Sequence, residues 1–128
     1  MILDYKTGTP PSQKEVDAGL APQLLLEAAM LQAGAFAGMA GGPVEELTYW
    51  HLTGGFHAGE SRTLFKADAD AIAAAVARSR EHFGRLIDAY DRPDRCYLSQ
   101  PEPGLAPRFS DYGQLARVAE WAAAGDEP

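Results

Sequence analysis

The sequence predicts an α/β fold, because segments typical of strands and of helices alternate along it. Residues 1–6 alternate apolar and polar side chains, as a half-buried strand does. Residues 22–33 are almost entirely apolar and end at Gly34, which is typical of a buried helix. Residues 44–53 are rich in β-forming side chains. This order favours two parallel strands joined through the helix by a right-handed crossover.

The segments that follow add two further helices. Residues 68–91 form the longest predicted helix, with Asp68 as its N-cap, and residues 111–124 form the last. An ambiguous polar segment, 13–20, has the pattern of a short helical turn, and 56–66 is expected to be irregular or a short strand. The longest helix carries its apolar side chains at helical spacing: Ile72, Val76, Phe83, Leu86, Ile87 and Tyr90.

Composition indicates one acidic domain. The chain has 128 residues, 46% of them hydrophobic, which is enough for a single core. Its net charge of −7 argues against a free-standing nucleic-acid-binding protein, but not against a module of a larger complex that supplies the basic surface. The sequence shows neither a signal peptide nor an apolar run near the roughly 20 residues of a membrane span. These features predict a cytoplasmic protein without a membrane partner.

The first strand carries a candidate catalytic pair. Side chains two residues apart on a strand share a face, so Asp4 and Lys6 point the same way. A carboxylate can hold a divalent cation, and a neighbouring lysine can orient or deprotonate a water molecule and offset the charge of a phosphate group. The pair therefore predicts metal-assisted cleavage of a phosphodiester bond.

Two polar side chains interrupt the apolar surface of the helix at 22–33. Gln23 and Glu27 lie four residues apart and therefore on one face of the helix. Because polar groups on a buried helix need partners, the pair either lines a cleft beside Asp4 and Lys6 or occupies a narrow strip that faces solvent. The pattern alone leaves both interpretations open.

Other candidates have less support. His51 and His57 can be interpreted as metal ligands, although ordinary hydrogen-bonded histidines fit the pattern better. Tyr49 and Trp50 are expected to pack in the core. The single cysteine, Cys96, excludes an internal disulfide framework and a multi-cysteine metal site.

These motifs resemble a known family. The motif Asp-Tyr-Lys-Thr-Gly at residues 4–8, followed by a helix that begins Gln-Leu-Leu-Leu-Glu at residues 23–27, resembles the carboxyl-terminal nuclease domain of the RecB/AddB group. That group belongs to the PD-(D/E)XK phosphodiesterase superfamily. The stretch from Asp111 to Trp121 also resembles the end of an AddB-type subunit of the alphaproteobacterial variety. The resemblance spans nearly the whole chain.

The resemblance implies roles for individual residues. Asp4 corresponds to the family's second metal-binding acid, Lys6 to its catalytic lysine, and Gln23 to the helix glutamine that closes the active site. Thr7 and Glu27 would line the cleft, although Glu27 stands where the broader family commonly has a tyrosine. The implied cofactor is Mg²⁺, and the implied substrate is DNA.

The resemblance also implies that the site is incomplete in this chain. The family's first metal-binding aspartate lies on a preceding strand without a counterpart here. The fold is therefore expected to be an incomplete restriction-endonuclease-like core, a strand–helix–strand unit with two further helices and its upstream strands missing. Residues 1–124 would form this distal part of the domain, inactive alone, and 125–128 a frayed tail.

The implied parent protein is a helicase–nuclease that processes double-strand breaks for recombinational repair, together with an AddA-type partner subunit. Some AddB-type subunits hold an iron–sulfur cluster through four cysteines, which the lone Cys96 does not support. The alternative function is a non-catalytic scaffold or protein-interaction module that keeps the nuclease fold.

The strand at residues 1–6 is expected to have one open edge, because the strand at 44–53 covers only the other. An exposed apolar edge invites pairing with another chain. The sequence therefore predicts a homo-oligomer in which the strands at 1–6 are paired or exchanged.

Overall fold

The computed structural model describes residues 1–56, 59–99, 104, 113–117 and 120. They fall into two compact units, Met1–Asp88 and Ala89–Pro128, which are treated separately. The elements in chain order are β1 Ile2–Lys6, α1 Gln13–Asp17, α2 Gln23–Gln32, β2 Leu47–His51, β3 Glu60–Thr63, the 3-10 helix η1 Leu64–Ala67, α3 Ala69–Tyr90 and α4 Gly113–Ala116.

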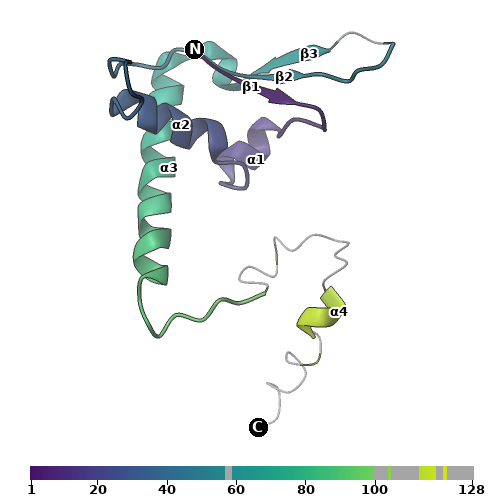
Figure 1. Ribbon diagram of the computed structural model, residues 1–128, viewed down its shortest axis with the longest axis vertical. Coiled ribbons are helices and arrows are strands. Elements are labelled where there is room, and N and C mark those ends of the chain that lie inside the picture. Colours follow the sequence, from purple (N-terminus) through teal and green to yellow (C-terminus); the bar gives the residue numbers. More distant parts are fainter. Residues whose placement is uncertain (57–58, 100–103, 105–112, 118–119, 121–128) are drawn as a thin grey trace. The chain divides into compact units, whose positions relative to one another are not determined.

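The first unit is built on a mixed three-stranded sheet with the order β1–β2–β3 (Figure 1). β1 pairs with β2 in parallel, and the chain crosses between them through α1 and α2, so the predicted parallel pairing with a helical connection is confirmed. β2 is shorter than the predicted strand at 44–53. β3 lies antiparallel to β2, which settles the ambiguous segment at 56–66 as containing a short strand.

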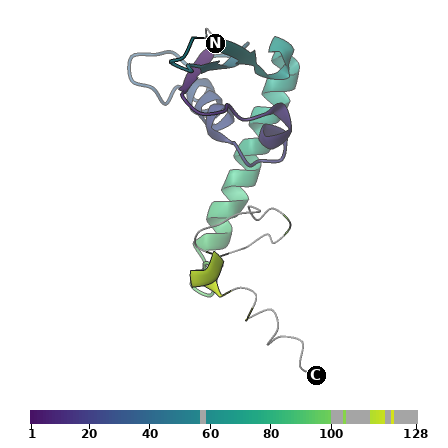
Figure 2. The ribbon, with the colours of Figure 1, turned by 90° about the vertical axis from the view of Figure 1, so that its right-hand side faces the viewer.

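One face of the sheet is covered by helices. The ribbon views place α1 and α2 on the same side of the strands (Figure 1; Figure 2). Leu47 and Tyr49 point to this side and are almost fully buried. They join a single hydrophobic core to which α2 and α3 also contribute, with the buried members Val16, Leu24, Leu25, Ala28, Val44, Leu47, Tyr49, Leu64, Ile72, Ala75 and Val76.

The opposite face carries an exposed aromatic pair. Tyr5 and Trp50 meet edge to face, with ring centroids 5.6 Å apart. The prediction that Trp50 packs in the core is wrong, since its exposed fraction is 43%. The physical reason is strand alternation: Tyr49 points to the helices, so its neighbour Trp50 must point away from them.

Helix α2 begins and ends close to its predicted limits. Pro22 is its N-cap, and the chain leaves the helix through Gly34, whose φ of 67° is favourable for glycine. Gly41 returns so close to the end of the helix that an added Cβ would lie 2.7 Å from the carbonyl oxygen of Gln32. The glycine-rich connection is thus a tight turn back towards β2.

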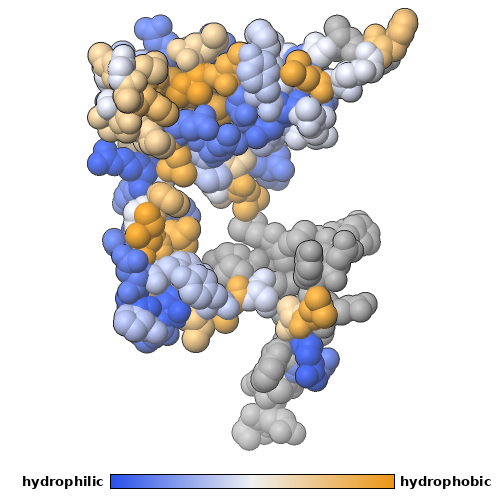
Figure 3. All heavy atoms as spheres, viewed as in Figure 1, coloured by the Kyte–Doolittle hydropathy of each residue, from blue (hydrophilic) through white to orange (hydrophobic). Residues whose placement is uncertain are grey.

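Helix α3 is buried along only part of its length. Asp68 caps it by accepting hydrogen bonds from the backbone of Asp70 and Ala71, both at 3.0 Å, so the predicted N-cap is confirmed. Ile72 and Val76 reach the core, whereas Phe83, Leu86 and Ile87 are exposed. Hydrophobic side chains are therefore visible along the second half of α3 (Figure 3). The first part of α3 therefore contributes to the core and the second part does not.

The connection from β3 to α3 has an unusual backbone. Phe65, Lys66 and Ala67 have φ values of 53°, 51° and 57°, a left-handed conformation that costs non-glycine residues about 1–2 kcal/mol each. The side chain of Gln13 stabilises it by accepting a hydrogen bond of 2.8 Å from the backbone N–H of Phe65. This bond ties α1 to the end of the sheet.

Within the second unit, the rings of Tyr90 and Tyr97 stack with centroids 4.8 Å apart. Arg92 forms an ion pair with Asp94 at 2.7 Å, which lowers the pKa of that carboxyl. Of the helix predicted at 111–124, the described part includes α4; its remaining residues and the tail at 125–128 lie outside the described residues.

We expect Ala67→Gly to raise the free energy of unfolding by about 0.5–1 kcal/mol, because glycine adopts a positive φ without steric strain. The matched control is Ala73→Gly, at an exposed position inside α3, which should lower it by about 1 kcal/mol. Urea unfolding followed by circular dichroism measures both. Equal destabilisation by the two substitutions would contradict the left-handed turn.

Candidate active site at the end of strand β1

Asp4 and Lys6 form an ion pair on the helix-covered face of β1. Lys6 Nζ lies 2.8 Å from Asp4 Oδ2, and both side chains are mostly shielded from solvent, with exposed fractions of 29% and 15%. They share a face because they are two residues apart on a strand. The predicted juxtaposition of carboxylate and ammonium is therefore present.

Helix α2 extends this pair into a chain of four polar side chains. Lys6 Nζ donates a hydrogen bond of 2.9 Å to Gln23 Oε1, and Gln23 Nε2 donates one of 3.1 Å to Glu27 Oε1. Gln23 opens the helix and Glu27 lies one turn later, so both face β1. The structure thus brings together Asp4, Lys6, Gln23 and Glu27. Thr7 is exposed just beyond β1.

Tyr49 lies beneath this group. It is the cross-strand partner of Asp4 in the parallel pair, and its ring centre is 5.8 Å from Lys6 Nζ. Burial, followed by the negative charges of Asp4 and Glu27, raises the pKa of Tyr49 to about 12. The phenol therefore stays neutral at physiological pH and presents its ring to the ammonium group.

The position of Tyr49 beneath the Asp4–Lys6 pair does not follow from the local sequence pattern. The signal that could have revealed it is the strand register, since a parallel pairing of β1 with β2 sets Asp4 opposite Tyr49. That register depends on contacts between residues far apart in the chain, which a local pattern does not contain.

The Asp4 carboxylate has the chemistry of a cation ligand. Its Oδ2 atom is buried, and the Lys6 ammonium 2.8 Å away supplies the positive charge that a buried carboxylate oxygen needs. Carboxylate oxygens are the ligands that magnesium prefers. Asp4 therefore fits a divalent cation, although no three His, Cys, Asp or Glu side chains gather around one point in the described part of the chain.

A second row of polar side chains lies at the end of β2. Lys6, His51 and Glu60 are cross-strand partners on the three strands. His51 Nδ1 is 3.7 Å from Glu60 Oε1, and Arg62 approaches the same oxygen at 3.6 Å. Arg62 also donates a hydrogen bond of 2.9 Å to the carbonyl of Pro10 in the loop after β1. His57 lies outside the described residues, so the structure does not test it as a partner of His51.

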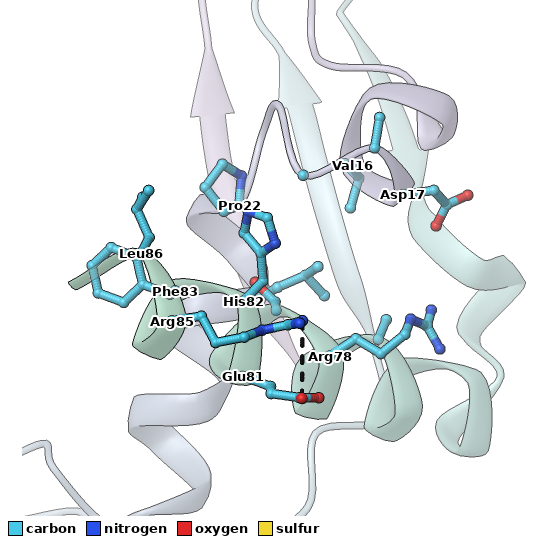
Figure 4. Close-up of a pocket in the computed structure, with 14 residues that line it drawn as sticks. Val16, Asp17, Pro22, Arg78, Glu81, His82, Phe83, Arg85 and Leu86 are labelled. Carbon is cyan, nitrogen blue, oxygen red and sulfur yellow. Dashed lines mark ion pairs between the residues drawn. The ribbon is translucent and has the colours of Figure 1, made fainter. Parts of the chain in front are cut away.

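The first unit also has a groove apart from these polar groups. It has a volume of about 410 Å³ and lies between α1, the turn before α2, and α3 (Figure 4). Val16 and Pro22 line one side and Arg78 and His82 the other. Arg85 lies in the same wall and pairs with Glu81 of its own helix, 3.9 Å away.

The buried phenol gives folding a specific pH dependence. Because the pKa of Tyr49 is raised from 10.0 to about 12 in the folded state, its stabilising contribution is complete below pH 10 and falls as the pH rises towards 12. A shift of this size corresponds to about 2–3 kcal/mol.

Urea unfolding at increasing alkaline pH, without divalent cations, measures this dependence. Tyr49→Phe keeps the ring and removes the ionisable group, so this variant should lose less stability than the wild type over that range. Parallel losses in the two proteins would show that Tyr49 ionises as readily folded as unfolded.

Comparison with known proteins gives the wider context. The chain is 57% identical over 35 residues to uncharacterized proteins of Rickettsia conorii and Rickettsia felis, and 54% identical over the same length to one of Rickettsia bellii. The matched segment covers 27% of this chain and 4% of each relative, so the chain corresponds to a small part of those proteins. No solved structure matches the chain significantly.

A family match covers most of the chain. Residues 1–100 match the PD-(D/E)XK nuclease superfamily, and the mixed sheet with its helices agrees with the predicted restriction-endonuclease-like α/β fold. In the described residues, no helix is both long and apolar enough to cross a membrane. The chain belongs to the PD-(D/E)XK nuclease superfamily.

Proposed function

We propose that this chain contributes Asp4, Lys6 and Gln23 to the active site of a magnesium-dependent nuclease that hydrolyses DNA phosphodiester bonds. The observation that carries the proposal is the hydrogen-bonded group itself: the carboxylate and ammonium of β1 meet the amide of α2 in a member of a nuclease superfamily. Nucleases of this superfamily generally depend on divalent metal ions.

Asp4 would hold the metal ion through its carboxylate. A divalent cation bound there supplies Lewis-acid stabilisation of the negative charge that develops on the phosphate. Glu27 is the second carboxylate near this point. Its carboxylate accepts a hydrogen bond from the side-chain amide of Gln23.

Lys6 would orient the attacking water and offset charge on the phosphate. Its ammonium has three N–H donors, of which Gln23 Oε1 accepts one. When Asp4 directs its oxygens to a cation, Gln23 still fixes the position of Lys6. Glu27 holds the amide so that its oxygen, rather than its nitrogen, faces the ammonium. The helix thus positions the lysine independently of the metal ligand.

The parent protein that we propose is an AddB-type subunit of a helicase–nuclease that processes double-strand breaks, with an AddA-type partner. The support is the Asp-Tyr-Lys-Thr-Gly motif at residues 4–8 with the glutamine of α2. Within the described residues, Asp4 belongs to no group of three or more His, Cys, Asp or Glu side chains that could hold a metal ion. We therefore propose that groups outside the chain complete the site, and that the chain alone does not hydrolyse DNA.

Metal binding tests the assignment of Asp4. We expect the chain to bind Mn²⁺, a spectroscopic substitute for Mg²⁺, and Asp4→Asn to weaken binding about ten-fold or more because a charged ligand is lost. Asp70→Asn, at an exposed position in the first turn of α3, is the matched control and should bind as the wild type does. Electron paramagnetic resonance of free Mn²⁺ measures the affinity.

A nuclease assay with Mg²⁺ on the chain should detect no hydrolysis. Hydrolysis that disappears in Lys6→Ala would show that the chain holds a complete site. Mn²⁺ binding that is unaffected by Asp4→Asn would instead favour the alternative function, a non-catalytic scaffold or interaction module with the nuclease fold.

We also propose that the chain self-associates through β1. Ile2 N–H and Lys6 C=O bond to the β2 side, so by alternation the N–H groups of Leu3 and Tyr5 point to the other edge. Among the described residues, no strand pairs with that edge, and unpaired edges favour intermolecular strand pairing.

Light scattering at increasing concentration tests this association. We expect the wild type to form dimers and Leu3→Pro to remain monomeric, because proline removes an outward N–H group without disturbing the bonds to β2. The matched control Leu3→Ala keeps the outward N–H group at the same position and should leave the dimer intact. A monomeric wild type at high concentration would refute edge pairing.

A further inference from the structure

The end of the sheet carries a histidine beside the proposed catalytic lysine. His51 is the last residue of β2 and the cross-strand partner of Lys6. Directly paired residues on neighbouring strands project to the same face, so the side chains of His51 and Lys6 leave their strands on the same side of the sheet. The backbone N–H of Leu52 donates a hydrogen bond of 2.8 Å to the carbonyl of Lys6, which continues the pairing past this row.

The backbone around His51 is held closely. β3 starts at Glu60, the partner of His51 on the other side. At the preceding Gly59, an added Cβ would lie only 2.4 Å from the carbonyl oxygen of His51, so the two backbones are in direct contact. The position of the imidazole is therefore fixed from both neighbouring strands.

Charged side chains of β3 lie beside the His51 imidazole. The carboxylate of Glu60 is 3.7 Å from Nδ1. Arg62 approaches the same carboxylate oxygen at 3.6 Å and donates a hydrogen bond to the carbonyl of Pro10. The imidazole is partly open to solvent, with an exposed fraction of 21%, and a ring nitrogen that carries a proton can donate a hydrogen bond to a ligand.

We propose that His51 is a substrate-binding residue that contacts the DNA backbone beside the phosphate group bound at Lys6. This assignment rests on the proposed function and adds a residue to the same site. Phosphodiesters present negatively charged oxygens, and charge-assisted hydrogen bonds to such oxygens are among the stronger polar contacts. Lys6 and His51 offer two donors on one sheet face, and the Glu60 carboxylate lies 3.7 Å from the second of them.

Binding of a short fluorescein-labelled oligothymidylate, followed by anisotropy with Ca²⁺ present, tests the proposal on the full chain. Ca²⁺ binds carboxylate oxygens as Mg²⁺ does. We expect His51→Ala to weaken binding about ten-fold, as the loss of one charged hydrogen bond predicts. Glu60→Gln should weaken it less. The matched control is His82→Ala, an exposed histidine of α3, which should bind within about two-fold of the wild type.

Imidazole NMR spectra give a second readout that does not depend on affinity. The His51 signals should shift on addition of the oligothymidylate and stay unchanged with its uncharged methylphosphonate analogue, whereas the His82 signals should respond to neither. Thermal unfolding of His51→Ala shows whether the variant folds. If it does not, the wild-type spectra alone decide between the outcomes.

The outcomes separate this inference from the proposed function. If Lys6→Ala weakens binding and His51→Ala does not, and the His51 signals do not shift, the role of His51 is refuted and the nuclease proposal stands. If the wild type does not bind the oligothymidylate, or binds it equally well with Lys6→Ala and His51→Ala, both are refuted. Equal shifts with the charged and uncharged analogues would refute a phosphate contact.

Discussion

The parallel pairing of β1 with β2 is the constraint on which the rest of the structure depends. It places Asp4 opposite Tyr49 and Lys6 opposite His51, so one register sets the neighbours of both proposed catalytic side chains. A slip by one residue would turn Asp4 and Lys6 to the open face, away from Gln23. The packing of Ile2 against the core opposes such a slip, because Ile2 shares the face of Asp4 and would turn away from the core with it. Core packing and site geometry therefore depend on the same contacts.

The polar side chains at the end of β1 are held in place by two different elements, the strand and helix α2. Asp4 and Lys6 are fixed by the strand, whereas Gln23 is fixed by the first turn of α2, which is anchored through buried leucines. The loop between them is held at two points, by Arg62 at Pro10 and by the hydrogen bond from Phe65 to the side chain of Gln13. The crossover is therefore attached to the far strand as well as to the helices.

Much of this arrangement could be predicted from the sequence because it follows from local periodicity. The shared face of Asp4 and Lys6, the Gln23–Glu27 spacing, the limits of α2 and the cap at Asp68 are all properties of short segments. The prediction for Trp50 is wrong because the two faces of β2 differ: helices cover the face of Tyr49, and the face of Trp50 is exposed. The left-handed turn after β3 and the position of Tyr49 could not be predicted, since both depend on contacts between distant residues. The exposure of the second half of α3 could not be predicted either, because its apolar spacing is the same as in the buried first half.

The close approach at Gly59 limits which substitutions this region can accept. A side chain of any size would meet the His51 carbonyl, so even alanine would force β3 away from β2 or bend the turn before it. That displacement would move Glu60, whose carboxylate lies 3.7 Å from the His51 imidazole. Gly59 is therefore expected to tolerate few substitutions, although it has no side chain that could take part in binding or catalysis. A substitution of Gly59 would change the position of His51 without changing any polar residue.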